Sequence, residues 1–331
     1  WDQGVRPWSP GDMMLFFEML SMIRIERKAE VVDIGIISAE DTVFNAGTES
    51  REDCRLDPLS LLRICPCPGS VFQFNSRKEF SRFWDMNSGR YDVFPSLNGD
   101  VPESLDPRVC IVRMEEFFKR NGYLPSLRIG SRDISWAHNF FLENLAEGCF
   151  PVVVSLDQPK KSASSAPAVD IRVWRDFLDR CRAEFPEVIF IVVGPEEGLR
   201  GSANALMAKD FGTSIMDDMA LMRAALMYMG VSSRNNALLW CSDTPYVILQ
   251  DRSFADYQGA GSYQFRFASK CQKMFSASAL MTPEFLRDGF KAVYDGIDRE
   301  KWVTAARQWA RRRNSLPSEI LYKKALSYKS N

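Results

Sequence analysis

The chain has 331 residues, enough for two domains that each bury a core of their own. Its 42 lysines and arginines are balanced by 43 aspartates and glutamates, so the sequence lacks the excess of basic residues that a duplex-binding face requires, and we expect no nucleic-acid partner. No apolar run approaches the roughly 18 residues of a membrane span and no signal peptide opens the sequence, so we expect a cytoplasmic protein.

The first half is predicted to alternate strands and helices. Gly4–Trp8 is expected to end a strand, and Ser9–Asp12 to form a tight loop with a capping residue ahead of an amphipathic helix, Met13–Lys28. A strand at Val31–Ile37 would complete a β-α-β unit. The remaining predicted elements are a short helix at Leu59–Ile64, a strand at Val71–Phe74, and helices at Arg77–Met86, Pro107–Gly122 and Asp133–Glu147.

The second half is predicted to begin with a new buried strand after Gly148. We therefore expect an N-terminal Rossmann-like domain over residues 1–148, a C-terminal Rossmann-like domain over 149–290 and a helical segment over 291–331. A strand at 151–156 and a helix at Ile171–Glu184 are separated by a polar loop that carries Lys160 and Lys161. That loop is either a surface loop or a lid over a phosphorylated ligand.

The stretch from Val188 to Leu249 organises this half. Val188–Val193 is almost entirely β-branched and ends at Gly194, which indicates a buried parallel strand followed by a loop. The next predicted elements are a helix that begins near Asp217 and ends at Gly230, a polar turn at Ser232–Asn236, a helix at Ala237–Cys241 and a strand at Tyr246–Leu249. In an open α/β sheet, ligands bind beyond the carboxyl ends of such strands.

The C-terminal part, Pro283–Tyr328, is helical by pattern. Trp302, Ala305, Ala306 and Trp309 share one helix face, whereas Arg307 and Arg311–Arg313 make the opposite side basic. We expect this helix to pack across the two domains, and contact with an anionic membrane is the alternative.

Cysteine and histidine usage argues against a metal site. The eight cysteines are scattered and only Cys65 and Cys67 lie close together, so reduced thiols are expected. The single histidine, His138, has apolar neighbours in a predicted helix and is expected to be structural and not part of a Ser-His-Asp triad. We predict no metal ligands.

Two motifs carry a resemblance to a known family. Ser9-Pro10-Gly11-Asp12 opens the first long helix, and a late segment runs from Met229-Gly230-Val231 through Ser232–Asn236 to a strand introduced by Pro245. Together they resemble GT-B-type glycosyltransferases, especially the bacterial heptosyltransferase-like and polysaccharide-assembly enzymes. The late motif departs from the family pattern, because Ser232-Ser233-Arg234 stand where Asp-Thr-Gly is typical, and Ala237 stands where His is typical.

The resemblance implies a fold, an activity and a set of site residues. The fold would be two Rossmann-like domains facing a cleft, and the activity inverting transfer of a sugar from a nucleotide-sugar donor to a glycan or lipid-linked acceptor, with the donor as co-substrate and no resident cofactor. Asp12 would be the base, with a plain helix cap as its alternative role. The expected donor-binding residues are Gly11, Gly194, Glu196, Ser232, Ser233, Arg234 and Asn235.

Several alternatives stay open. Glu197 competes with Glu196 for the ribose or base, and the turn at 232–236 is otherwise an ordinary polar connection. A polysaccharide pyruvyltransferase shares a similar frame and would bind phosphoenolpyruvate through Arg234, Lys160 and Lys161. A non-catalytic scaffold of a polysaccharide assembly complex is the third hypothesis.

Overall fold

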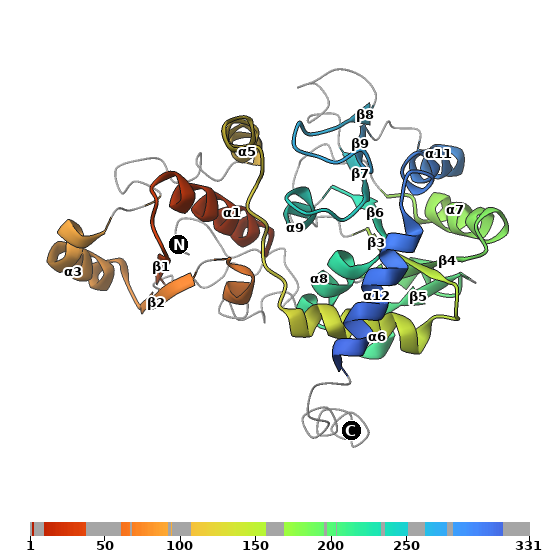
Figure 1. Cartoon of the computed structure of the whole chain (residues 1–331), viewed down its shortest axis with the longest axis horizontal. Helices are drawn as coiled ribbons and strands as arrows, with labels where there is room; N and C mark the ends of the chain where they lie inside the picture. The colour runs from red at the N-terminus through yellow and green to blue at the C-terminus, as the bar shows by residue number, and fades with distance from the viewer. Residues whose placement is uncertain are drawn as a thin grey trace.

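A computed structural model describes most of the chain: residues 2, 10–37, 61–66, 68–91, 94, 107–156, 169–194, 197–202, 204–232, 236–250, 262–276 and 281–313. These residues form a two-stranded sheet and a seven-stranded sheet, each accompanied by helices (Figure 1). The predicted α/β class with parallel strands is therefore confirmed.

The first half is built around one buried helix and a small parallel sheet. Its elements are α1 (Pro10–Glu26), β1 (Val32–Ile37), a 3-10 turn η2 (Leu62–Ile64), β2 (Pro68–Phe74), α3 (Arg77–Asn87), a 3-10 turn η3 (Ser88–Arg90) and α5 (Pro107–Asn121). β1 pairs with β2 in parallel, and Asp2 forms a parallel bridge with Ile37. The expected first strand, Gly4–Trp8, lies outside the described residues.

Helix α1 differs from its prediction in two respects. It begins at Pro10 and not at Met13, so Gly11 and Asp12 are helical residues. Every residue from Gly11 to Met22 is buried, which leaves no solvent-facing side on this stretch, and the expected amphipathic helix is wrong. A helix that is apolar on all sides is one enclosed by other elements.

The second half contains the large sheet. Its strands are β3 (Phe150–Ser155), β4 (Val188–Val193), β5 (Ala205–Met207), β6 (Met227–Val231), β7 (Tyr246–Gln250), β8 (Ser262–Tyr263) and β9 (Gln272–Ser276). They are arranged in the order β5-β4-β3-β6-β7-β9-β8, and all pair in parallel except β8. Without the antiparallel edge strand this is the doubly wound order 3-2-1-4-5-6.

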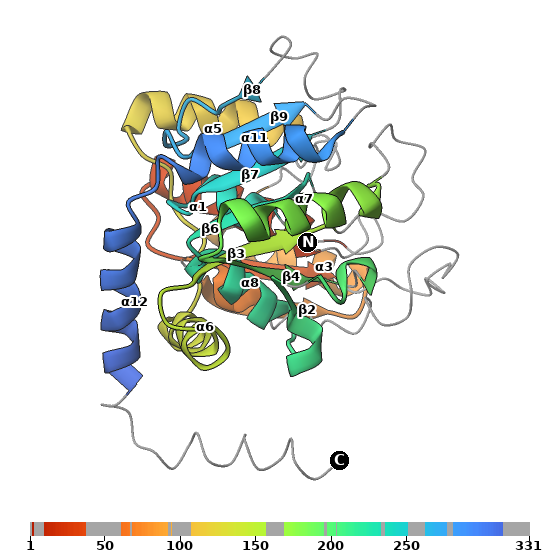
Figure 2. The same cartoon turned by 90° about the vertical axis from the view of Figure 1, so that its right-hand side faces the viewer.

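Successive side chains of the large sheet point alternately into two hydrophobic cores, one on each face. Val152 and Val154 point into a core formed with α7 (Ile171–Glu184) and α11 (Pro283–Tyr294), which lie side by side over one face in Figure 2. Val153 points into the opposite core, which α1, α5, α6 (Ser131–Asn144), α8 (Ile215–Ala224) and α9 (Ala237–Trp240) share. The helices of the first half therefore complete the core on one face of the second-half sheet.

Helix α6 precedes the predicted boundary near residue 148 but packs on elements of the second half. It lies against α8 and against α12 (Arg299–Arg313), beneath the large sheet in Figure 1. From α12, the Trp302 ring reaches Phe141 of α6 and Phe150 of β3. This C-terminal helix thus contacts residues on both sides of the predicted boundary, and the boundary itself stays a prediction.

One segment of the second half was predicted wrongly. The helix expected to run from Asp217 to Gly230 ends at Ala224, and Met227–Val231 form β6 in the centre of the sheet. Both faces of β6 are buried, so its sequence is apolar without alternation and continues the helical pattern of α8. Strands β5, β8 and β9 were not predicted, and residues 314–328 of the expected C-terminal helix lie outside the described part of the chain.

Among the described helices, none has the length and apolar character needed to cross a membrane.

Candidate functional site

The candidate site lies where the strand order of the large sheet reverses. Ser155, the last residue of β3, is in register with Val193 of β4 on one side and with Gly230 of β6 on the other. Gly194 and Ser232 follow these two neighbouring strands, so both lie at the carboxyl edge that flanks β3. In doubly wound sheets this switch point is where ligands bind.

Glycine is required at two positions of this edge for different reasons. Gly194 has a φ of 88°, a left-handed conformation that lets the chain turn sharply out of β4. At Gly230 the limit is space. A Cβ there would lie well inside van der Waals contact of the Ser155 carbonyl oxygen and 2.6 Å from the Tyr228 hydroxyl.

The Tyr228 hydroxyl is part of a buried polar pair. It donates a hydrogen bond to Asn236 Oδ1 at 3.0 Å, and Asn236 Nδ2 donates to the Val231 carbonyl at 3.1 Å. Both side chains are fully buried. The backbone N–H of Ser232 donates to the Leu249 carbonyl of β7 at 2.7 Å. The segment between β6 and α9 is thus tied at both of its ends.

Asp12 lies in the first turn of α1 and is 2% exposed. A carboxylate at this position interacts favourably with the positive end of the helix dipole. Because the helix begins at Pro10, Asp12 is inside it and the alternative role as the residue that caps it is wrong. Gly11 is buried beside it.

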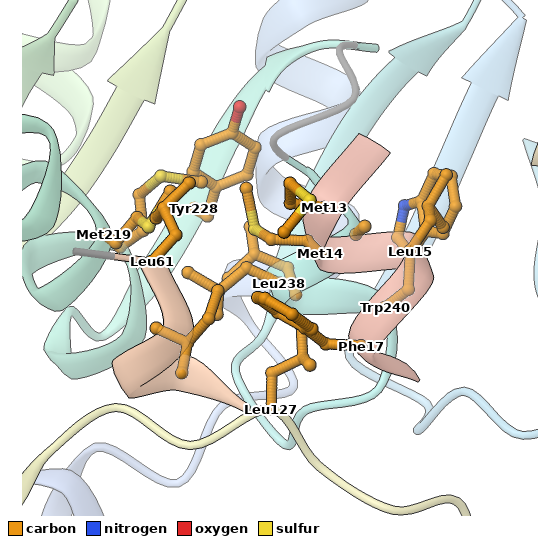
Figure 3. Packing of buried hydrophobic residues seen from close by; sticks show 14 of the residues in the cluster. Met13, Met14, Leu15, Phe17, Leu61, Leu127, Met219, Tyr228, Leu238 and Trp240 are labelled. Carbon is orange, nitrogen blue, oxygen red and sulfur yellow. The ribbon is translucent and has the colours of Figure 1, made fainter. Parts of the chain in front are cut away.

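Helix α1 brings Asp12 towards the second half. It packs on α9, and Figure 3 shows the side chains of Met13 and Met14 among those of Tyr228 and Leu238. The predicted helix Ala237–Cys241 is confirmed as the single turn Ala237–Trp240. The segment with Asp12 and the connection that follows β6 therefore belong to one packed unit.

The other predicted site residues lie outside the described part of the chain. They are Glu196, Ser233, Arg234 and Asn235, together with Lys160 and Lys161 of the polar loop. Their roles stay predictions. Glu197, the competitor of Glu196, opens the short 3-10 turn η4 (Glu197–Leu199), which follows β4 in the chain.

Glu18 is a buried carboxyl that the sequence reasoning missed. It is 1% exposed in α1 and burial raises its pKa to about 8. Its neighbour is the Cys241 thiol, whose pKa is raised by burial and by Glu18. A thiol is only a weak hydrogen-bond donor, and neither carboxyl oxygen of Glu18 has a hydrogen bond of normal geometry. The signal in the sequence was a lone glutamate inside the apolar run Met13–Met22.

His138 lies in an aromatic cluster between α6 and α12. It stacks on Trp309 with ring centroids 6.4 Å apart, and Phe141 contacts its edge. Burial lowers its pKa to about 4, so the imidazole is neutral at physiological pH. These contacts fit the structural role expected for this residue. Among the described residues no group of three or more Cys, His, Asp or Glu is placed to hold a metal ion.

Comparisons with known proteins give matches in structure alone. No protein-family model matches the chain, and no curated protein does. The structure of E. coli ADP-heptose LPS heptosyltransferase II is similar with a TM-score of 0.53 at 12% identity, covering 86% of this chain and 95% of that one. A glycosyl transferase family 9 protein from Veillonella parvula gives 0.48 at 10% identity, covering 92% and 95%, and an E. coli heptosyltransferase with ADP gives 0.43 at 12%, covering 86% and 97%.

The first of these matches establishes a shared fold over most of both chains. The chain has the GT-B-type arrangement of parallel α/β sheets seen in a heptosyltransferase, as the resemblance in the sequence implied.

Proposed function

We propose that the protein is a glycosyltransferase that moves a sugar from a nucleoside-diphosphate donor to a glycan or lipid-linked acceptor in a bacterial cytoplasm. The observation that carries the proposal is the packing of α1, with Asp12 in its first turn, on α9, which follows β6 at the switch point. The helix that carries the candidate base therefore contacts the helix that directly follows the candidate donor segment. The fold shared with an ADP-heptose heptosyltransferase supports a nucleotide-sugar donor.

Asp12 is the proposed general base. In an inverting transfer it takes the proton of the acceptor hydroxyl as that oxygen attacks the anomeric carbon of the donor. The bond to the nucleoside diphosphate breaks in the same step, and the leaving group carries away the bonding electron pair.

The leaving diphosphate needs donors of hydrogen bonds and positive charge. Ser232, Ser233, Arg234 and Asn235 supply hydroxyl, guanidinium and amide groups in the connection after β6. The turn at Gly194 and the neighbouring Glu196 would hold the ribose or base at the end of β4. Because α9 has only one turn, we assign diphosphate binding to these side chains and not to a helix dipole.

A non-catalytic scaffold is the second candidate, favoured by one observation. Ala237, which stands where the family pattern has histidine, is 1% exposed and packs in the core. Alanine offers no polar group that could assist sugar transfer at this position. As a scaffold, the protein would bind a nucleotide without turning it over.

Peripheral contact with an anionic membrane is a further part of the proposal. Lys301 and Arg307 are exposed on α12, whose Trp302 and Ala306 turn towards the protein. Exposed lysine and arginine side chains on a helix favour negatively charged lipid surfaces. Sedimentation with vesicles that contain an anionic lipid tests this, and the double variant Lys301→Glu, Arg307→Glu should lose any binding.

The first experiment is a thermal-shift panel of UDP, GDP, CMP, dTDP and ADP with phosphoenolpyruvate as the contrasting ligand. A ligand at about a hundred times its dissociation constant adds about 2.7 kcal/mol of stability, which raises Tm by several degrees. A selective shift with one nucleoside diphosphate supports the glycosyltransferase and identifies its donor class. A shift with phosphoenolpyruvate alone would favour pyruvyl transfer, and a flat panel would contradict nucleotide binding.

A further inference from the structure

Gln250 is a buried amide at the carboxyl end of a central strand. It is the last residue of β7 and is 3% exposed. Within the described part of the chain, the hydrogen-bond partner of its Nε2 is the sulfur of Met274 at 3.7 Å. A thioether is a weak acceptor, so this contact does little to offset the free energy of burying an amide. Stability alone therefore does not explain a glutamine at this position.

The side chain of Gln250 points to the face of the large sheet that α1 covers. Ile248 and Tyr246, two and four residues earlier on β7, belong to the core that α1 shares. Because side chains alternate along a strand, Gln250 lies on the same side as these two residues. Its neighbour Met274 belongs to that core as well. Gln250 is therefore on the side of the sheet where the helix that carries Asp12 packs.

Gln250 is also close to the start of the segment assigned to the diphosphate. Leu249, directly before it, pairs with Val231 at the end of β6 and accepts a hydrogen bond from the backbone N–H of Ser232 at 2.7 Å. Gln250 and Ser232 thus follow paired residues on adjacent strands, which lie about 4.8 Å apart. Both residues are at the carboxyl edge of the sheet, where ligands of doubly wound folds bind.

The order of the strands matches the order of the groups in a nucleotide sugar. β4, β3, β6 and β7 are consecutive neighbours in the large sheet. The proposed function places the ribose or base after β4, at Gly194, and the diphosphate after β6, at Ser232. In a nucleotide sugar the sugar is bonded directly to the diphosphate, on the side away from the ribose. A donor that continues in the same direction along the edge brings its sugar to the end of β7.

The chemistry of an amide suits a sugar better than a diphosphate. A glutamine side chain is neutral and offers two N–H donors and one carbonyl acceptor, whereas a diphosphate requires positive charge and donors alone. A sugar hydroxyl donates one hydrogen bond and accepts others, so neighbouring hydroxyls can use both ends of the amide.

We propose that Gln250 binds the sugar of the donor through hydrogen bonds to its hydroxyl groups, and so helps to determine which sugar is transferred. This inference rests on the proposed function. On binding, the amide exchanges its weak contact with Met274 for the sugar.

The test is titration calorimetry with two ligands: the nucleoside diphosphate that the wild type binds, and its hexose derivative, which is UDP-glucose, GDP-mannose, dTDP-glucose or ADP-glucose. Gln250→Leu removes the amide and keeps a similar volume. We expect its affinity for the hexose derivative to fall about tenfold, while its affinity for the nucleoside diphosphate stays that of the wild type. Its Tm should equal or exceed that of the wild type, because only a weak contact is lost.

Gln272→Leu is the matched control. Gln272 is 1% exposed and pairs with Tyr246, so it lies at the opposite end of the same strand pair. Its Nε2 donates to the Ser242 carbonyl at 2.6 Å and to the Thr244 carbonyl at 3.0 Å. We expect this variant to have a lower Tm and wild-type affinity for both ligands.

Three results would overturn the inference. If Gln250→Leu binds the hexose derivative as tightly as the wild type does, Gln250 does not contact the sugar and the proposed function survives. A fall in Tm as large as that of Gln272→Leu would show that the Gln250 amide is structural. If the wild type binds none of the nucleotides in the panel, the proposed function fails and the inference fails with it.

Discussion

The indole N–H of Trp302 donates a hydrogen bond to the backbone carbonyl of Ala224 across 3.0 Å. Ala224 is the last residue of α8, where helical carbonyl groups lack partners within the helix. Trp302 supplies one from α12 and at the same time packs on His138 and Phe141 of α6. One side chain thus fastens three helices together beneath the large sheet.

Replacing Trp302 by phenylalanine should destabilise the protein by about 1–2 kcal/mol, because the hydrogen bond to Ala224 is lost while most of the ring packing is kept. The measurement is denaturation in urea. Lys301→Ala, one residue away and exposed, serves as the control and should stay within about 0.5 kcal/mol of the wild type. Equal stability of the two variants would show that the contact is dispensable.

Glu18 should make stability depend on pH. Its carboxyl stays protonated in the folded protein up to a pKa of about 8, whereas in the unfolded chain it ionises near 4.5. The stability that the neutral form provides is therefore complete below pH 4.5 and is lost as pH rises through 8, by a few kcal/mol. We expect Tm to fall from pH 5 to pH 8 and Glu18→Gln to flatten that decline.

Glu26→Gln on the same helix is the control for Glu18. Glu26 lies near the surface in an ion pair with Arg120, so its loss should cost less than about 1 kcal/mol and leave the pH profile of the wild type in place. A Glu18→Gln profile parallel to that of the wild type would mean that Glu18 is not the group responsible.

Gly230→Ala should be strongly destabilising, by about 3 kcal/mol or more, because the new methyl group meets the rigid backbone oxygen of Ser155. Gly89→Ala provides the comparison, since a Cβ there has no atom within 4 Å. The measurement is the melting temperature of each variant in thermal unfolding. Similar melting temperatures would disprove the close approach of β3 and β6.

Asp12→Asn should lower kcat by about two to four orders of magnitude while nucleotide affinity stays nearly unchanged, because the amide cannot accept the acceptor proton. Asp133→Asn, in the first turn of α6 and paired with Arg63 at the surface, should keep full activity. Equal turnover by Asp12→Asn and the wild type would remove Asp12 from the mechanism.

Arg234→Ala should weaken nucleoside-diphosphate binding by about 1.5–3 kcal/mol if the guanidinium makes a charge-assisted contact. Arg266→Ala, at an exposed residue near α5, is the control and should bind normally. Unchanged affinity of Arg234→Ala would mean that the turn after β6 is only a polar connection.

Elements with one dominant local signal were predictable. The helix Ile171–Glu184 and the strand Val188–Val193 match the structure residue for residue, since one shows clear amphipathic spacing and the other is β-branched at every position except Phe190. The prediction of β6 failed because burial on both faces removes the alternation of apolar and polar residues that distinguishes a strand from a helix. The prediction that α1 is amphipathic failed because the elements that enclose this helix come from distant parts of the chain, including α9.

The candidate site was predictable only in part. The sequence places Gly194 after a strand, but it predicts a helix before Ser232, and only the pairing of β4 and β6 with β3 in the structure brings the two residues to one edge. The pair of Tyr228 and Asn236 depends on the fold placing the start of α9 beside β6, which residue types alone do not encode. Glu18 stands out in the sequence as a charged residue in an apolar run. Its raised pKa, however, comes from its burial beside Cys241, which only the fold provides.

The packing of α6 on α12 has a consequence for the newly made chain. The face of α6 that receives Trp302 stays uncovered until the ribosome has added every residue from Leu145 to Trp302. At about 5–20 residues per second this takes on the order of ten seconds. During that interval an aromatic surface with Phe141 and His138 is without its partner helix, and apolar surface exposed during synthesis is prone to aggregation.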